Sequence, residues 1–346
     1  MKHPRSPEWP QKAVFTLGAV FAMEIAFNNE RGLMSDQKPS TPKLLSLSGG
    51  GFRGFFQANI LSYMEAELGM PLARLFALIA GTSIGGINAL SLAAEIPTEK
   101  MVNFYKDWGP KIFPKIRWPL GLIRQKFSDK QLRAALEQLL EDRTIEDLKH
   151  KVLIPAVNLS TGMPQVFKTP HHANLVMDKK YSLVDVALAT SAAPTYFPIH
   201  KMDGLDGSYM VDGGLVANHP GLYACIEAEQ FLNMGKLPYK LLHIGTMSSG
   251  ITDVCKTVNS GFLTRWRGKL FDLSISAQEA ATENILKFKL GPDRYMKIDV
   301  TPPKEQVKFI ALDKANPKAQ QILSQQARSA YQNARTALQK YMAEGE

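Results

Sequence analysis

The sequence predicts an α/β protein with a mostly parallel central sheet flanked by helices. Three observations predict it: short apolar runs that end in glycines, helix-like stretches that follow them, and the repetition of this order along the chain. Hydrophobic residues make up 45% and charged residues 21% of the 346 positions. This composition excludes a largely disordered chain, a collagen-like fibre and a polytopic membrane protein. The length is sufficient to bury a substantial core, and we expect one domain with insertions.

The first two strand–helix units follow one another directly. An apolar run at 44–47 ends in a glycine-rich turn, and residues 57–68 then carry apolar side chains at three- and four-residue steps. Residues 75–80 are expected to form the next strand, and 87–94 the start of a buried helix. Strand, glycine turn and helix, repeated in this order, are typical of βαβ units.

The later elements continue the alternation. We expect strands at 152–159, 239–247 and 295–300. We expect helices near 128–140, 183–188, 221–233 and 271–288, and an amphipathic helix at 317–342 that lies on the body of the protein.

Residues 1–40 are expected to be an N-terminal appendage to a single domain at 41–346. The uncharged, mostly apolar stretch at 13–23 is shorter than the roughly 18 residues that span a bilayer. A docking helix or an alternative start at Met34 explains it, and a signal peptide remains the alternative. The two cysteines, Cys225 and Cys255, exclude a disulfide framework and a cysteine-based zinc site, and they favour a reducing compartment.

The net charge of +9 favours anionic partners, although a basic surface also simply keeps a protein soluble. Seven basic and two acidic residues lie between Lys106 and Lys130, so this stretch supplies five of the nine charges. Aromatic residues and prolines are interleaved with them, and we expect an insertion at 104–127 that forms a lid or a membrane-facing loop. The alternative is an irregular insertion that packs its aromatic rings inward.

Gly81-Thr82-Ser83-Ile84-Gly85 lies between an expected strand and an expected helix. In that context Gly-x-Ser-x-Gly forms a nucleophile elbow, in which Gly81 and Gly85 permit a sharp turn that exposes the Ser83 hydroxyl. The N-terminal amides of the following helix point toward whatever the serine attacks.

A second glycine-rich segment, Ser48-Gly49-Gly50-Gly51-Phe52-Arg53-Gly54, precedes the elbow. A phosphate-binding loop is the alternative for three adjacent glycines, but the spacing fits neither Gly-x-Gly-x-x-Gly nor Gly-Lys-Ser/Thr. Free backbone N–H groups near a nucleophilic serine are what an oxyanion hole requires. Arg53 adds a positive charge that would hold the loop in place or neutralise a developing oxyanion.

Asp212-Gly213-Gly214 is, taken alone, a common surface turn. Together and in this order, the glycine loop, the elbow serine and Asp-Gly-Gly resemble the patatin-like phospholipase family. The segments 191–198 and 215–218 resemble it too, so that the resemblance runs from about residue 43 to 219.

The resemblance implies a three-layer architecture and a Ser–Asp dyad without histidine, with Ser83 as nucleophile and Asp212 as base. It also implies an oxyanion hole and a supporting loop. The hole would be formed by Gly49, Gly50, Gly51 and Arg53, and the supporting loop by Gly54, Gly213 and Gly214. Many relatives carry aspartate where this chain has Ser48.

The dyad is chemically coherent if Asp212 is buried. A serine hydroxyl needs an adjacent base, and an aspartate with its ordinary pKa near 3.9 is a weak one, whereas burial raises that pKa. A Ser–Asp–His arrangement that uses His243 is the alternative. His171, His172 and His200 lack a recognisable ligand spacing, so we expect no metal and no cofactor.

We therefore expect a phospholipase A type of lipid acyl hydrolase that acts on membrane phospholipids from the cytoplasmic side. Bacterial relatives include effectors that cyclic nucleotides activate in anti-phage signalling, and this chain is similar in size and in its basic C-terminal part. The basic residues that would bind a cyclic dinucleotide are Arg265, Arg267, Lys269, Lys287, Lys289, Arg294 and Lys297. No nucleic acid polymer is expected as a partner, and a homo-oligomer stays open. The alternatives are a neutral-lipid or glycolipid esterase, and a lipid- or nucleotide-binding regulatory protein with little turnover.

Overall fold

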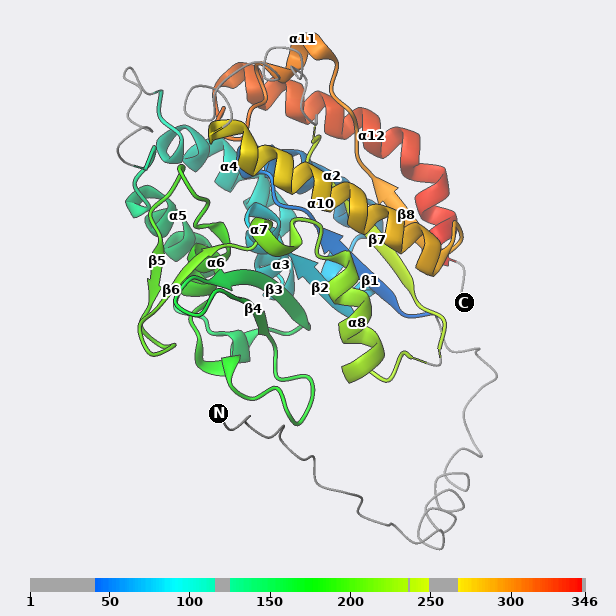
Figure 1. Ribbon diagram of the computed structural model, residues 1–346. Helices are drawn as coiled ribbons and strands as arrows, with labels where there is room; N and C mark the ends of the chain where they lie inside the picture. The colour runs from blue at the N-terminus through cyan, green and yellow to red at the C-terminus, as the bar shows by residue number, and fades with distance from the viewer. Residues whose placement is uncertain (1–40, 116–124, 236, 249–266, 344–346) are drawn as a thin grey trace, which may run out of the picture. The chain divides into compact units, whose positions relative to one another are not determined.

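The computed structural model describes residues 41–115, 125–235, 237–248 and 267–343 (Figure 1). Five strands of its sheet run parallel, in the spatial order β3, β2, β1, β7, β8. These are β1 (Lys43–Leu47), β2 (Leu78–Gly81), β3 (Val152–Asn158), β7 (Lys240–Ile244) and β8 (Tyr295–Ile298). The side chains of β1, β2 and β7 are almost all buried, as expected of parallel strands covered on both faces.

Three antiparallel strands extend the sheet beyond β3. β4 (Met163–Lys168) pairs with β3 over nearly its whole length, β6 (Ser208–Asp212) pairs with its last three residues, and β5 (His200–Met202) pairs with β6. Because β4 occupies one edge of β3, β2 and β6 share the other edge, where β2 pairs with residues 152–153 and β6 with 156–158. The carboxyl ends of β2 and β6 therefore point toward each other along one edge of β3.

Helices cover both faces of the sheet, which confirms the expected α/β class with a mostly parallel sheet. The larger buried cluster lies on the face covered by α2 (Gly54–Leu68), α3 (Ile84–Ala93), α4 (Thr98–Ile112), α5 (Lys130–Leu140), α6 (Leu183–Ser191) and α12 (Pro317–Ala343). Figure 1 shows α8 (Gly221–Phe231) and α10 (Arg267–Leu290) in front of the other face, where a second buried cluster lies. The short helices α7 (Gly214–Ala217) and α11 (Lys304–Val307) complete the described elements.

Most expected elements lie within a few residues of their predicted bounds. At 75–80 the strand begins only at Leu78, because a 3₁₀ turn occupies Leu72–Leu75. The antiparallel strands β4, β5 and β6 were not expected from the sequence. Each of these strands is short. In β4 and β6, exposed residues interrupt the apolar pattern by which a strand is recognised in the sequence.

Residues 104–112 of the expected insertion at 104–127 belong to α4 and do not form a loop. Pro110 lies inside this helix and cannot donate to the carbonyl of Lys106, but Gln320 Nε2 of α12 donates to that oxygen at 3.5 Å. The rings of Phe104 and Tyr105 are buried, as in the inward-packing alternative, while Lys106 is exposed. Residues 116–124 of the expected insertion and the appendage at 1–40 lie outside the described residues.

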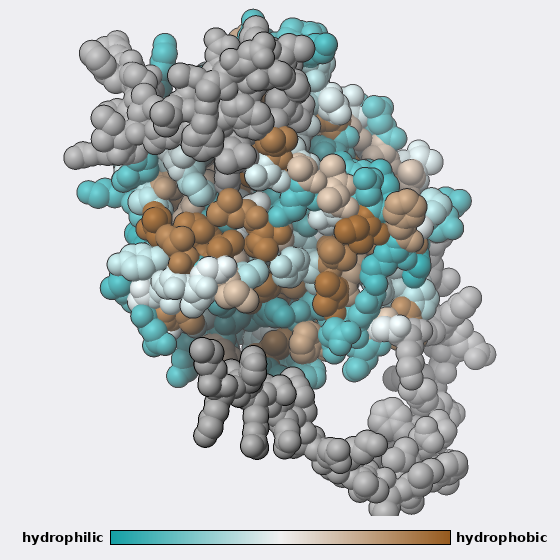
Figure 2. All heavy atoms as spheres, in the orientation of Figure 1, coloured by the Kyte–Doolittle hydropathy of each residue, from teal (hydrophilic) through white to brown (hydrophobic). Residues whose placement is uncertain are grey.

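The described helices include none that is long and apolar enough to cross a membrane. Apolar side chains do reach the surface beside the sheet, for example Leu159, Tyr209 and Leu215. Figure 2 shows a hydrophobic band in the region of α7 and β6.

α12 is an integral part of the core, and loss of its contact with α2 would lower the free energy of unfolding. Leu323 on this helix is fully buried, and Arg335 Nε donates to Glu67 of α2 at 3.0 Å. We expect Leu323→Ala to lower the free energy of unfolding by about 2–5 kcal/mol, because it removes buried methyl groups and leaves a cavity. Urea unfolding followed by circular dichroism measures this. The matched control on the exposed side of α12 is Arg328→Ala, for which a change above about 0.5 kcal/mol is not expected.

Candidate active site

Ser83 lies on a sharp turn between β2 and α3, with φ 55° and ψ −125°. Positive φ is strained for a residue with a side chain, and such strain persists only where surrounding contacts enforce it. Here Ser83 N donates to Thr190 Oγ1 at 2.9 Å, and Thr190 Oγ1 donates to Pro155 O at 2.6 Å. Gly85 completes the turn, since a Cβ there would overlap the carbonyl of Leu47 in β1. The backbone thus has the geometry expected of a nucleophile elbow.

Asp212 lies at the end of β6, opposite Ala156 of β3. Ser83 Oγ donates a hydrogen bond to Asp212 Oδ2 at 2.7 Å, and Gly214 N donates to Asp212 Oδ1 at 2.6 Å. The two residues are 129 positions apart in sequence. They meet because β2 and β6 point toward each other along the same edge of β3.

Burial raises the pKa of Asp212 to about 6, against the opposing effect of the hydrogen bonds from Ser83 and Gly214. The side chain is only 3% exposed. A carboxylate with this pKa remains ionised at neutral pH and accepts a proton more readily than an ordinary aspartate. Ser83 and Asp212 therefore have the geometry and the basicity that nucleophilic activation requires.

The glycine loop presents two backbone amides beside the serine. The carbonyl of Gly49 accepts hydrogen bonds from Thr246 Oγ1 at 2.8 Å and from Asn218 Nδ2 at 3.4 Å. The carbonyl of Gly50 accepts from Arg53 N at 3.2 Å and from Arg53 Nε at 3.4 Å. Because C=O and N–H point in opposite directions across a trans peptide, these bonds also fix the directions of the Gly50 and Gly51 amides.

Neither of these two amides has a hydrogen-bond acceptor within the described part of the chain. The Gly49 amide, in contrast, donates to Asn218 O at 3.2 Å and is already used. Arg53 holds the loop, since its Nη1 also donates to Met247 O at 3.3 Å. Gly51 has φ +55°, and a Cβ there would overlap Leu312 O, so that only glycine fits.

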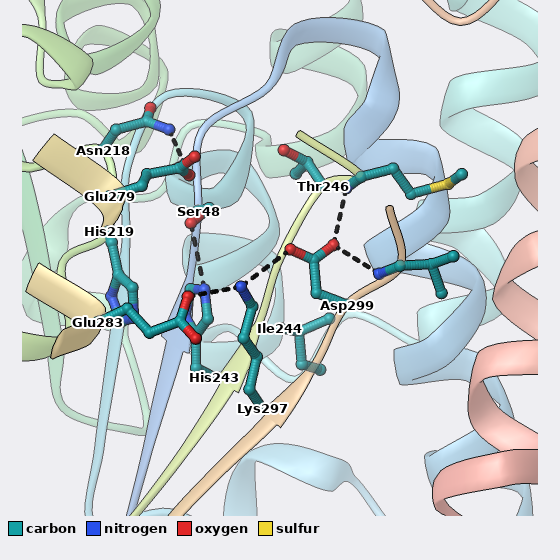
Figure 3. Close-up of polar contacts among 12 residues, drawn as sticks. Ser48, Asn218, His219, His243, Ile244, Thr246, Glu279, Glu283, Lys297 and Asp299 are labelled. Atoms are coloured by element: carbon teal, nitrogen blue, oxygen red, sulfur yellow. Dashed lines mark hydrogen bonds and ion pairs between the residues drawn. The ribbon is translucent and has the colours of Figure 1, made fainter. Parts of the chain in front are cut away.

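A buried polar network lies behind this loop (Figure 3). Asn218 Nδ2 donates to Glu279 Oε1 of α10 at 2.7 Å, and Asn218 N donates to Gln278 Oε1 at 2.5 Å. Burial raises the pKa of Glu279. Asn218 thus connects α10 to the carbonyl of Gly49.

Sequence reasoning did not assign roles to the side chains of Asn218, Thr246 and Glu279. Asn218 lies in the segment 215–218, which was noted for its resemblance. Thr246 lies two residues beyond the carboxyl end of the parallel strand β7, which was the available signal. Glu279 gave no such signal, because an acidic residue on a helix of mixed polar and apolar residues looks, in the sequence, like an ordinary solvent-exposed glutamate.

His219 and His243 stack with ring centroids 3.5 Å apart (Figure 3). Burial lowers the pKa of both rings, that of His219 to about 3. The two ring nitrogens of His243 lie against Ser46 Oγ at 3.2 Å and Ser48 Oγ at 3.4 Å. His243 is therefore a neutral, packed residue behind the glycine loop, and the Ser–Asp–His alternative gains no support.

The basic residues expected to bind a nucleotide have other partners wherever the structure describes them. Lys287 and Lys297 pair with Glu283, and Lys289 pairs with Glu229. Arg294 Nε donates to Leu290 O at the end of α10. The side chains of Arg265, Arg267 and Lys269 lie outside the description. All four described residues thus form ion pairs or backbone hydrogen bonds within the protein.

A cavity of about 370 Å³ opens beside Ser83. Its polar end contains Gly50, Gly51, Arg53 and Asp212. The rest is mainly apolar and includes Ile84, Ile87, Phe104, Tyr105, Ile112, Phe113, Leu132, Phe197, Val307 and Ile310. A cavity that is polar at the serine and apolar beyond it fits an ester with a long hydrocarbon chain. Across the described residues, no group of three or more acidic, histidine or cysteine side chains is placed to hold a metal ion.

Comparison with known proteins finds relatives over most of the chain. Residues 45–224 match the family model described as patatin-like phospholipase. A protein of Pseudomonas aeruginosa named cGAMP-activated phospholipase is 42% identical over 301 residues, which cover 85% of this chain and 89% of that protein. Proteins of the same name from Escherichia coli and Vibrio cholerae are 36% and 35% identical. They cover 82% and 83% of this chain, and 86% and 89% of their own lengths.

The raised pKa of Asp212 makes a prediction about stability. The folded protein retains a proton on Asp212 that the unfolded chain releases, so the buried carboxylate lowers the free energy of unfolding as the pH rises from about 4 through about 6. Asp212→Asn removes this charge. We expect the variant to be more stable than the wild type by roughly 1–3 kcal/mol at pH 7.5, with the difference vanishing near pH 4.

Urea unfolding at the two pH values measures this difference. Asp142→Asn, at an exposed carboxylate, is the matched control. An equal gain in both variants would show that burial of Asp212 is not the cause.

Proposed function

The chain belongs to the patatin-like phospholipase family and is a serine hydrolase of the phospholipase type, and from this we propose that Ser83 and Asp212 cleave phospholipid esters as a catalytic dyad. The observation that carries the proposal is the 2.7 Å hydrogen bond from Ser83 Oγ to Asp212 Oδ2. It lies at the polar end of an otherwise apolar cavity.

In the first half-reaction, Ser83 Oγ attacks the ester carbonyl carbon while its proton moves to Asp212 Oδ2. The carbonyl oxygen becomes an oxyanion, which the Gly50 and Gly51 amides stabilise. The tetrahedral intermediate then collapses. The bond to the glycerol oxygen breaks, Asp212 returns the proton to that oxygen, and a lysophospholipid leaves the acyl-enzyme.

In the second half-reaction, water attacks the acyl carbon and gives a proton to Asp212. Collapse of the second tetrahedral intermediate breaks the bond to Ser83 Oγ, which recovers its proton from Asp212. The fatty acid is released. One carboxylate therefore serves as base and as acid in turn, as its pKa of about 6 permits.

The two amides stabilise the oxyanion because they are held in place before the substrate arrives. Thr246 and Asn218 hold the Gly49–Gly50 peptide, and Arg53 holds the Gly50–Gly51 peptide. Donors that need no reorganisation during the reaction contribute most to lowering its barrier.

Activation by a cyclic dinucleotide is the second part of the proposal. Three relatives that cover at least 82% of this chain bear the name cGAMP-activated phospholipase. Such control, with the resemblance to bacterial effectors noted above, supports a role in anti-phage defence. An uncontrolled phospholipase would damage the membrane of the cell that makes it.

Ser83→Ala and Asp212→Asn should each reduce fatty-acid release from phospholipid vesicles by at least about 10³-fold, because each removes a participant in proton transfer. In the wild type the rate should fall as the pH drops below about 6, since protonated Asp212 accepts no proton. Ser329→Ala, on the exposed side of α12, is the control. Equal activity in all variants would place the reaction at a different site, and release only from neutral lipids or glycolipids would favour those esters as substrates.

Fatty-acid release by the purified wild type should depend on a cyclic dinucleotide. We expect activity to rise at least about tenfold with one member of a panel of cyclic dinucleotides, and not with the corresponding linear dinucleotides or mononucleotides. Full activity of the protein alone would contradict this regulation but leave the dyad in place.

A further inference from the structure

The segment that follows β8 forms one wall of the cavity. Val307, Ile310 and Leu312 line the cavity together with residues of α4. Leu312 O also accepts a hydrogen bond from Phe52 N at 2.7 Å, next to the glycine loop. Residues 304–315 therefore lie at the cavity mouth and contact the loop that holds the two free amides.

The same segment displays an aromatic ring and several cations outward. Phe309 is 36% exposed, and Lys308 Nζ lies 5.0 Å from the centre of its ring. Lys304 and Lys314 are exposed as well. An exposed aromatic ring with lysines around it suits the headgroup region of a lipid bilayer.

α4 adds lysines on the other side of the same mouth. Its last residue, Ile112, and the following Phe113 line the cavity, and Gln320 of α12 donates a hydrogen bond to Lys106 O of α4. Together with Phe309, six exposed lysines form what we term the mouth surface: Lys106, Lys111, Lys304, Lys308, Lys314 and Lys318.

The charge of the mouth surface is not neutralised from within the described residues. None of its six lysines forms an ion pair there, whereas Asp313, an acidic residue of the same segment, is paired with Lys126. Asp107 and Glu305 are exposed, which leaves a clear excess of positive charge. This excess complements an anionic surface.

We propose that the mouth surface docks the protein on a bilayer that contains anionic phospholipids, with the cavity mouth facing the lipid. The proposal rests on the proposed function, since a phospholipid enters the cavity most directly if its mouth faces the membrane. Each lysine near an anionic bilayer contributes about fivefold in affinity. Docking also places lipid contacts next to Leu312, and through Leu312 O next to the glycine loop.

The test uses full-length protein that carries Ser83→Ala, so that vesicles stay intact during the measurement. Lys308→Glu with Lys314→Glu is compared with Lys151→Glu with Lys180→Glu, which changes the charge equally. Lys151 precedes β3, at the end of the sheet away from Ser83, and Lys180 ends the 3₁₀ turn at Asp178–Lys180. All four lysines are exposed, and thermal unfolding checks that both variants fold.

Binding is measured by co-sedimentation with vesicles of 70% phosphatidylcholine and 30% phosphatidylglycerol over a range of salt concentrations. We expect the mouth-surface variant to bind at least about tenfold more weakly than the parent, with a smaller dependence on salt. The control variant should bind like the parent. Phe309→Ser should weaken binding further without changing the salt dependence.

Equal binding by the two double variants would overturn the proposal. So would normal vesicle binding combined with loss of the nucleotide response in an otherwise wild-type Lys308→Glu, Lys314→Glu protein, because the lysines would then serve the nucleotide. The binding assay requires no catalysis. A failure of the proposed hydrolysis would therefore appear in fatty-acid release and not in co-sedimentation.

Discussion

The hydrogen bond between Ser83 and Asp212 depends on the pairing of two strands, β2 and β6, with the same edge of β3. β2 pairs with the start of one edge of β3 and β6 with its end, so the two strands approach each other head-on. Pro155 O lies between the paired segments and accepts a hydrogen bond from Thr190 Oγ1, which also receives Ser83 N. Ser83 and Asp212 therefore meet at a gap between the paired segments, where Thr190 binds both Ser83 N and Pro155 O. A shift of β6 by one residue along β3 would turn Asp212 to the opposite face.

Burial raises the pKa of Asp212 and also lowers the free energy of unfolding at neutral pH. Enclosure raises the pKa of Asp212 and lowers the pKa values of His219 and His243. The two histidines remain neutral, so they add no positive charge that would pull the pKa of the carboxylate back down. Charges are present nearby as pairs, such as Lys297 with Glu283. The pKa of Asp212 is thus set by burial and by its hydrogen bonds with Ser83 and Gly214.

The sequence predicted the parallel strands, the main helices and the residues around Ser83 because these rest on local patterns. Apolar runs, glycine turns and helical periodicity are all visible within about 20 residues. β6 was not predicted, because its pairing with β3 depends on residues some 50 positions away and its pattern is partly exposed. α4 was obscured by Pro110, whose missing hydrogen bond is replaced by Gln320 from α12. The side chains of Asn218 and Thr246 bind the distant carbonyl of Gly49, and Glu279 binds the distant side chain of Asn218. No local pattern in the sequence reveals such contacts.

The contacts that fix the glycine loop have a consequence for synthesis of the chain. Gly49 lies two residues beyond the carboxyl end of β1, but the side chains that fix its carbonyl come from positions 169 and 197 residues later. A nascent chain that has emerged only as far as β6 contains Ser83 and Asp212, yet lacks Asn218, Thr246 and the 304–315 wall of the cavity. A ribosome-bound fragment that ends at β6 therefore contains Ser83 and Asp212 without the side chains that hold the Gly49 carbonyl. The direction of the Gly50 amide is therefore fixed only once residues up to Thr246 have been synthesised.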